Sequence, residues 1–155
     1  MIDDLIEPFV AATSSVFATM VGWEVTPGTP GTFEAQREYD LTSLIGLSGA
    51  STGVVMVHWA QSTALKAVGA MLGSEPAEVN ADVIDTLGEL TNMVAGSAKA
   101  SLSPMFSNLA LPIVLFGKNR ELGMPKYIQP IRIPFDSPCG PFSLELDIKP
   151  PDARQ

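Results

Sequence analysis

The stretch from residue 80 to residue 102 most constrains the fold, because its apolar residues repeat with the period of a long α-helix. They are spaced four, three and four residues apart and so share one helix face: Val83, Leu87, Leu90 and Val94. Asn80 can cap the first turn with its side-chain oxygen, and Pro104 disfavours helical geometry in the residue before it. We therefore expect one long helix at 80–102, packed against a core by this face.

The opposite face of the same helix carries three polar side chains, Asp85, Glu89 and Asn92, at positions i, i+4 and i+7. At 100° per residue they fall within about 60° of one another. Gly88 and Gly96 flank them, although a glycine inside a helix costs about 1 kcal/mol relative to alanine. Polar residues on a helix are commonly only solvated, but this combination predicts a surface that a partner approaches closely.

The rest of the chain predicts two more helices and a largely antiparallel sheet. The expected helices cover 2–20 and 62–72, and the expected strands cover 23–26, 33–39, 41–47, 54–59, 113–116, 127–135 and 142–148. A turn of small residues at 48–53 should join two strands in an antiparallel hairpin, and the run 113–116 should be buried. We expect one α+β domain over 1–155, a sheet layered with helices.

Charge and composition exclude several classes of protein. A formal charge of −8 and a pI near 4.4 leave no basic surplus for nucleic-acid phosphates. The chain begins with acids, and no apolar run is expected to reach the length of a membrane span, so a cytoplasmic location without membrane insertion is expected. The single cysteine, Cys139, cannot form an internal disulfide and is assigned no role.

Most self-contained active sites fail on residue types alone. A Ser-His-Asp site would use the single histidine, His58, but Ala50 replaces the last glycine of the G-x-S-x-G pattern around Ser48. One histidine and one cysteine are too few for zinc. The glycines at 46, 49 and 53 lack the lysine and hydroxyl residue of a phosphate-binding loop. We interpret His58 as a packed or edge residue of the sheet.

The acids of the long helix also make no complete site. Asp85 and Glu89 lie one turn apart on a convex surface that has no cleft for a sugar. Together with Asp82 they supply too few converging oxygens for calcium, so no metal of the chain's own is expected. Glu89 and Asn92 make most chemical sense inside another protein's active site, where a carboxylate pairs with a cation and an amide positions a water.

The run 83–96 closely resembles the signature helix of the CheC/CheX/FliY family of chemotaxis phosphatases. That family places Asp or Ser first, Glu four residues later and Asn three further, as Asp85, Glu89 and Asn92 do here. Pro112 resembles the family's later strand-opening proline, and the segments 44–49, 64–65 and 71–73 are also similar to the family. The chain has one signature helix rather than two, which makes it similar to the CheX branch of the family. This resemblance implies a CheC-like α/β sandwich and a homodimer.

The resemblance implies dephosphorylation of a CheY-type response regulator, whose aspartyl phosphate lies beside Mg²⁺ and a lysine. Glu89 would pair with that lysine, and Asn92 would align the attacking water. Asp85, Gly88 and Gly96 would contact the partner, and Pro112 would support the motif. The Mg²⁺ would belong to the partner. Two alternatives remain open: a regulator-binding or flagellar-switch-associated module without catalysis, and a small-molecule-binding domain, for which no pocket is identified.

Overall fold

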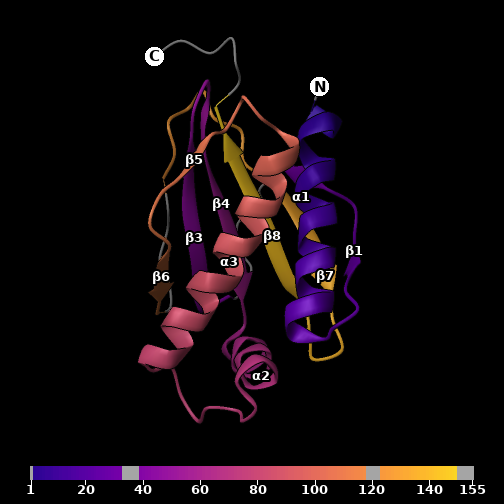
Figure 1. Cartoon of the computed structure of the whole chain (residues 1–155), viewed down its shortest axis with the longest axis vertical. Coiled ribbons are helices and arrows are strands. Elements are labelled where there is room, and N and C mark those ends of the chain that lie inside the picture. The colour runs from indigo at the N-terminus through magenta and orange to yellow at the C-terminus, as the bar shows by residue number, and fades with distance from the viewer. Residues whose placement is uncertain (1, 33–38, 118–122, 150–155) are drawn as a thin grey trace.

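The computed structural model describes residues 2–32, 39–117 and 123–149. It is an α+β fold in which an antiparallel sheet is covered on one face by helices (Figure 1). The helices are α1 (Ile2–Val16), which continues as a π-helical turn η1 (Phe17–Val21), α2 (Gln61–Leu72) and α3 (Ala81–Ser101). The expected fold class is confirmed.

The sheet has the strand order β1-β7-β8-β4-β3-β5, with β2 also pairing β7 and β6 also pairing β3. Its strands are β1 (Thr26–Pro27), β2 (Gly31–Thr32), β3 (Leu41–Ser48), β4 (Thr52–Trp59), β5 (Asn108–Leu109), β6 (Ile113–Phe116), β7 (Ile131–Asp136) and β8 (Phe142–Ile148). The predicted hairpin is β3–β4, in register from Leu41 opposite Trp59 to Ser48 opposite Thr52. Alternate residues therefore face the helices, and the others face away.

The long helix begins and ends where the sequence predicts. The side chain of Asn80 accepts a hydrogen bond from the backbone N–H of Val83 at 2.9 Å, and Leu102 is the C-cap. The preceding helix α2 stops at Gly73, which adopts a left-handed conformation with φ of 92°. Asn80 and Leu102 therefore mark the two ends of α3, the helix that carries the polar triad.

Several predicted strands differ from the structure. Of the strand predicted at 23–26, only the last residue is in a strand, β1. Of the strand predicted at 127–135, only the part from Ile131 onward is in a strand, β7. The weak strand expected at 33–39 falls on residues outside the described ranges, apart from Tyr39. The prediction that 113–116 is buried is wrong, because β6 is an outer strand on which Ile113 and Phe116 are exposed. An apolar run does not by itself separate an outer strand from a central one.

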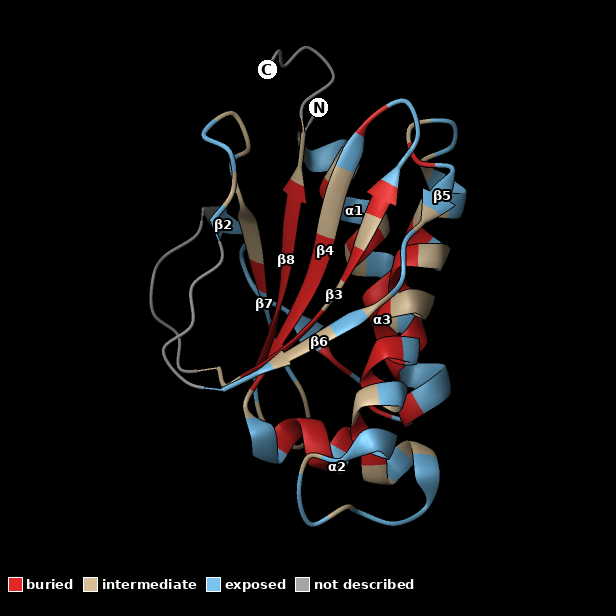
Figure 2. Ribbon diagram, turned by 90° about the vertical axis from the view of Figure 1, so that its left-hand side faces the viewer, coloured by how far each residue is buried: buried red, intermediate tan, exposed pale blue. Residues whose placement is uncertain are grey.

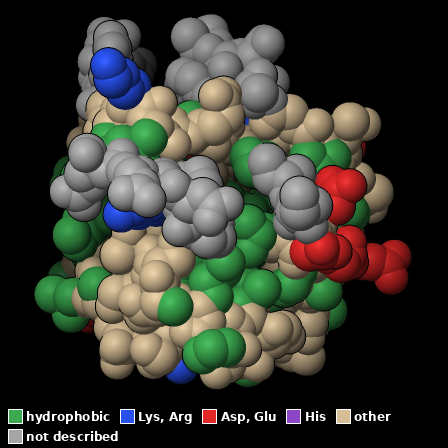
Figure 3. Space-filling view, turned by 90° about the horizontal axis from the view of Figure 1, so that it is seen from above, with side chains coloured by type: hydrophobic (Ala, Val, Ile, Leu, Met, Phe, Trp, Pro, Cys, Tyr) green, Lys and Arg blue, Asp and Glu red, His purple; other side chains and the backbone are tan. Residues whose placement is uncertain are grey.

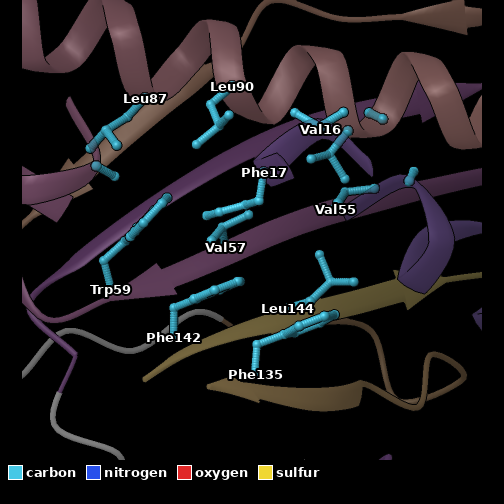
Figure 4. Packing of buried hydrophobic residues seen from close by; sticks show 14 of the residues in the cluster. Val16, Phe17, Val55, Val57, Trp59, Leu87, Leu90, Phe135, Phe142 and Leu144 are labelled. Atoms are coloured by element: carbon cyan, nitrogen blue, oxygen red, sulfur yellow. The ribbon is translucent and has the colours of Figure 1, made fainter. Parts of the chain in front are cut away.

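The core lies between α1, α3 and the sheet (Figure 4). Every residue of the predicted α3 stripe is at most 1% exposed. Below α3, the ring of Phe142 stacks on Phe17 with a centroid distance of 4.6 Å and on Phe135 at 5.1 Å. Trp59 lies against the same group, 5.6 Å from Phe142. Figure 2 shows the buried middle strands β3, β4 and β8 beside the helical layer.

The N-terminal helix departs from the expectation that no run reaches membrane-spanning length. Residues Asp3–Val21 are long and apolar enough to cross a membrane by length and composition. Part of this apolar surface is used inside the fold, because Phe9, Val16 and Phe17 are buried in the core beside α3.

Seen from the end at which α1 begins, acidic side chains gather on one side of the molecule (Figure 3), and the first turn of α1 contains Asp3 and Asp4.

A candidate partner-facing site on the long helix

The structure brings the three predicted polar residues together on the outer side of α3. Asp85 and Glu89 are exposed, whereas Asn92 is half-buried. Nδ2 of Asn92 donates a long hydrogen bond of 3.4 Å to Oε1 of Glu89. The pair is therefore adjacent, as expected, but the amide is less exposed than the sequence suggested. Because the apolar stripe fixes the opposite side of α3 in the core, the helix cannot rotate this pair inward without unpacking.

The two flanking glycines face the chain itself. Gly88 is buried, and a Cβ atom there would lie 3.4 Å from Cβ of Pro112. Gly96 is half-buried, and a Cβ there would lie 3.8 Å from Cδ1 of Leu109. The expectation that Gly88 is bare backbone open to a partner is therefore corrected: Pro112 covers it, at a distance that would still admit a Cβ atom. A contact of Gly88 or Gly96 with a partner stays a prediction.

A β-bulge shapes the segment that rests on α3. Leu47 pairs with Leu109 and Leu44 pairs with Ile113, so the outer chain has one more residue than β3 between these pairs. The ladder continues from β5 to Ala110, whose N–H donates to the carbonyl of Gly46 at 2.9 Å. Pro112 has no N–H to donate and is suited to the irregular position. The extra residue leaves Leu111 80% exposed.

A second polar group lies on the sheet face turned away from α3, and the sequence did not predict it. Nε2 of His58 lies 2.7 Å from Oε1 of Glu145, and Nη2 of Arg132 donates to the same oxygen at 2.8 Å. Nδ1 of His58 lies 2.8 Å from Oγ1 of Thr42. His58 is thus a buried, hydrogen-bonded residue of β4, as its packed interpretation expected. Only strand pairing, which a single sequence does not reveal, brings these four residues together.

Two acids on β8 have pKa values that are shifted in opposite directions. Burial alone would raise the pKa of Glu145, but hydrogen bonds with His58, Asp147 and Arg132 outweigh it and lower the pKa to about 2. Burial and the neighbouring Glu145 raise the pKa of Asp147 to about 8. Neither carboxyl oxygen of Asp147 has a hydrogen-bond partner in the described part of the chain when ionised. Protonated Asp147 can instead donate to Glu145, so the two acids share one negative charge.

The described residues contain no group of three or more His, Cys, Asp or Glu side chains arranged to hold a metal ion. The candidate site on α3 consists of the exposed carboxylate of Glu89 and the neighbouring carboxamide of Asn92, on a helix packed into the core. Such a pair can bind a cation and orient a water, which are functions that need a second molecule. The site roles of Asp85, Glu89 and Asn92 stay predictions.

Comparison with known proteins assigns the chain to a family. The family model described as chemotaxis phosphatase CheX matches residues 41–136, which include α3, the bulge and β7. The chain belongs to the CheX family. This membership confirms the family that the α3 motif indicated.

Individual CheX relatives agree with this assignment. The chain is 29% identical over 119 residues to the CheY-P phosphatase CheX of Thermotoga maritima, covering 72% of this chain and 77% of that one. A CheC-like superfamily protein from Shewanella sp. PV-4 has a TM-score of 0.85 and 34% identity, covering 95% and 98% of the two chains. CheX in the CheX–CheY–BeF₃–Mg²⁺ complex from Borrelia burgdorferi has a TM-score of 0.78, with coverages of 94% and 97%, and at 24% identity shares the fold.

Proposed function

We propose that this CheX-family protein accelerates hydrolysis of the aspartyl phosphate of a CheY-type response regulator by inserting Glu89 and Asn92 into the regulator's active site. The observation that carries the proposal is the outward-facing Glu89–Asn92 pair, 3.4 Å apart on α3. Support comes from the relative that carries the name CheY-P phosphatase and is 29% identical. The protein would be cytoplasmic and would act as a homodimer.

Glu89 would bind the regulator through the lysine beside the phosphorylated aspartate. Its side chain is exposed on α3 and can reach a partner without moving the helix. On docking, the carboxylate and ammonium would lose water together, which strengthens their attraction relative to a fully solvated pair. Asp85, one helical turn earlier and also exposed, would contact the rim of the same surface.

Asn92 would position the attacking water. Its Nδ2 donates to Glu89, which leaves Oδ1 to accept a hydrogen from water. The water oxygen would attack phosphorus in line, the aspartyl oxygen would leave as carboxylate, and inorganic phosphate would form. Positioning and one hydrogen bond would contribute about 2 to 4 kcal/mol, on the order of a hundredfold in rate. Mg²⁺ and the phosphoryl group would both belong to the regulator.

The test follows loss of phosphate from regulators of the same organism. Each purified CheY-type regulator is phosphorylated with a small phosphodonor, the donor is removed, and decay of the phosphorylated form is measured with and without this protein. Faster decay of at least one regulator is expected. Binding without faster decay, across all of them, would contradict the phosphatase and favour the interaction module.

A further inference from the structure

We propose that the bulge beside α3 is the docking ridge for the regulator's receiver domain, and that Leu111 is the residue whose burial determines affinity. The ridge is defined as the bulge residue Leu111, which is 80% exposed. The inference rests on the proposed function and deepens it by naming a contact surface outside the motif helix.

The ridge lies next to the candidate catalytic pair because of how α3 meets the bulge. Gly88 and Gly96 stand one turn before and one turn after Asn92, about 6 Å away in each direction along the helix. Gly88 faces Pro112, and Gly96 faces Leu109. Asn92 therefore lies between these two contacts, level with the residues that join Leu109 to Pro112. Leu111 is one of the two.

The fold places Leu111 outward at a position where it contributes little to the core. Leu109 lies beside Gly96 of the helix, and Pro112 packs on Gly88. The outer chain has one extra residue between the partners of Gly46 and Leu44, and this extra residue lets Leu111 point toward solvent. Bulges commonly re-aim a side chain next to a functional site. Ile113 pairs with Leu44, which faces away from the helices, so Ile113 lies on the other face of the sheet and is not part of the ridge. Leu109 is half-buried, which leaves Leu111 as the exposed apolar side chain beside Asn92.

Charge selects the occupant of this ridge. Asp85 and Glu89 are exposed on the adjoining face of α3, so the partner must offer a cation beside an apolar patch. A receiver domain with a lysine at the phosphorylation site meets the first requirement, and the rim around that lysine would cover Leu111. A second copy of this chain, paired symmetrically through the same face, would bring two sets of these acids together, and like charges at an interface are unfavourable.

The experiment measures binding separately from catalysis. The probe is the receiver domain of the regulator that this protein dephosphorylates, kept phosphorylated in excess acetyl phosphate. It is titrated against Asn92→Ala protein, and then against the same protein carrying Leu111→Ser. The expected result is a rise in Kd of about tenfold, equivalent to about 1.4 kcal/mol. In the Asn92-containing protein, Leu111→Ser should raise KM similarly and leave kcat within about twofold.

The matched control is Met20→Ser, which replaces another exposed apolar residue, 40% exposed, on η1. Figure 1 shows α1, which η1 extends, on the other side of α3 from β6, and Met20→Ser should leave Kd unchanged. Equal Kd values for the Leu111→Ser and parent proteins would overturn the ridge even if dephosphorylation is intact. The docking proposal would also be overturned if Leu111→Ser changed self-association, measured by light scattering, without changing the Kd for the receiver domain. If no regulator is dephosphorylated, the titration is run with each phosphorylated regulator, and loss of binding on Leu111→Ser would support the ridge while the phosphatase fails.

Discussion

Pro112 rests directly on Gly88, at a distance that leaves room for one methyl group: a Cβ at residue 88 would lie 3.4 Å from Cβ and 3.5 Å from Cγ of the proline. Gly88→Ala should therefore raise the free energy of unfolding by up to about 1 kcal/mol, because alanine is the better helix former. Urea unfolding would measure the change. Phosphatase activity should persist if Gly88 serves packing.

The control for this substitution is another helical glycine, Gly69 of α2. A Cβ at that position would lie 2.8 Å from Cα of Glu75, so backbone must shift to admit it. Gly69→Ala should lower the free energy of unfolding despite the same gain in helix propensity. A loss of regulator affinity in Gly88→Ala, with stability raised, would instead restore Gly88 as a partner contact.

The pattern of α3 shows what a single sequence can determine. Its apolar period placed Val83 and Leu90 in the core and Glu89 outside, because a helix fixes the direction of each side chain from spacing alone. The same period could not show that Gly88 is covered, since the covering residue, Pro112, comes from a bulge whose existence depends on strand register. Leu111 was missed for the same reason: an exposed leucine has no sequence signal until its neighbours are paired.

Arg132 should contribute strongly to stability through its hydrogen bond to Glu145. Both side chains are largely buried, at 13% and 7% exposed, so removing the guanidinium leaves a buried carboxylate with less compensation. Arg132→Met should lower the free energy of unfolding by about 3 to 5 kcal/mol. Thermal and urea unfolding would measure the loss.

Lys66 supplies the matched comparison for a surface ion pair. Its Nζ lies 3.7 Å from Glu75, with both side chains about half exposed. Lys66→Met should cost less than about 1 kcal/mol, because exposed pairs are weak. Equal effects of Arg132→Met and Lys66→Met would contradict the assigned difference in burial.

Asp147 should make the protein less stable as pH rises. Its pKa is about 8 in the folded state and 3.8 in the unfolded reference, so unfolding releases a proton between these values. This contribution to stability is fully present below pH 3.8 and is lost as pH rises through 8, with a slope of at most about 1.4 kcal/mol per pH unit. The contribution of Glu145 to stability has the opposite pH dependence: it is fully present above pH 4.5 and is lost as pH falls through about 2.

Asp147→Asn separates this effect, because an amide cannot ionise but can still donate to Glu145. The variant should be more stable than the parent protein at pH 8.5, and its stability should vary less between pH 5 and 8.5. Urea unfolding at both pH values gives the comparison. Identical pH profiles for the two proteins would show that Asp147 is already ionised in the folded state.

Glu89 should govern affinity for the phosphorylated regulator more than the rate of the chemical step. Glu89→Gln keeps the size and removes the charge, so the Kd for a phosphorylated receiver domain should rise about tenfold or more, as expected for a charge-assisted hydrogen bond. Glu7→Gln, an exposed site on α1, serves as the control and should change nothing. Unaltered affinity in Glu89→Gln would remove the lysine pairing from the mechanism.

The polar cluster on the sheet face turned away from α3 could not be predicted from the sequence. His58 was correctly interpreted as packed from its place in a β run, yet its partners come from three other strands at 42, 132 and 145. A charged residue inside an alternating strand reads as solvent-facing until the strands on both sides are known. The helix motif needed no such knowledge, so the adjacency of Glu89 and Asn92 could be predicted, whereas the buried cluster could not.

The most direct test of the central claim compares the parent protein with Asn92→Ala in dephosphorylation of the same regulator. Phosphate release is measured at saturating concentrations of each protein, so that differences in affinity do not enter. Asn92→Ala should lower the rate constant on the order of a hundredfold, toward the regulator's spontaneous rate, while its Kd changes by less than about threefold. A saturated rate equal to that of the parent protein would contradict the role of Asn92 in positioning the attacking water.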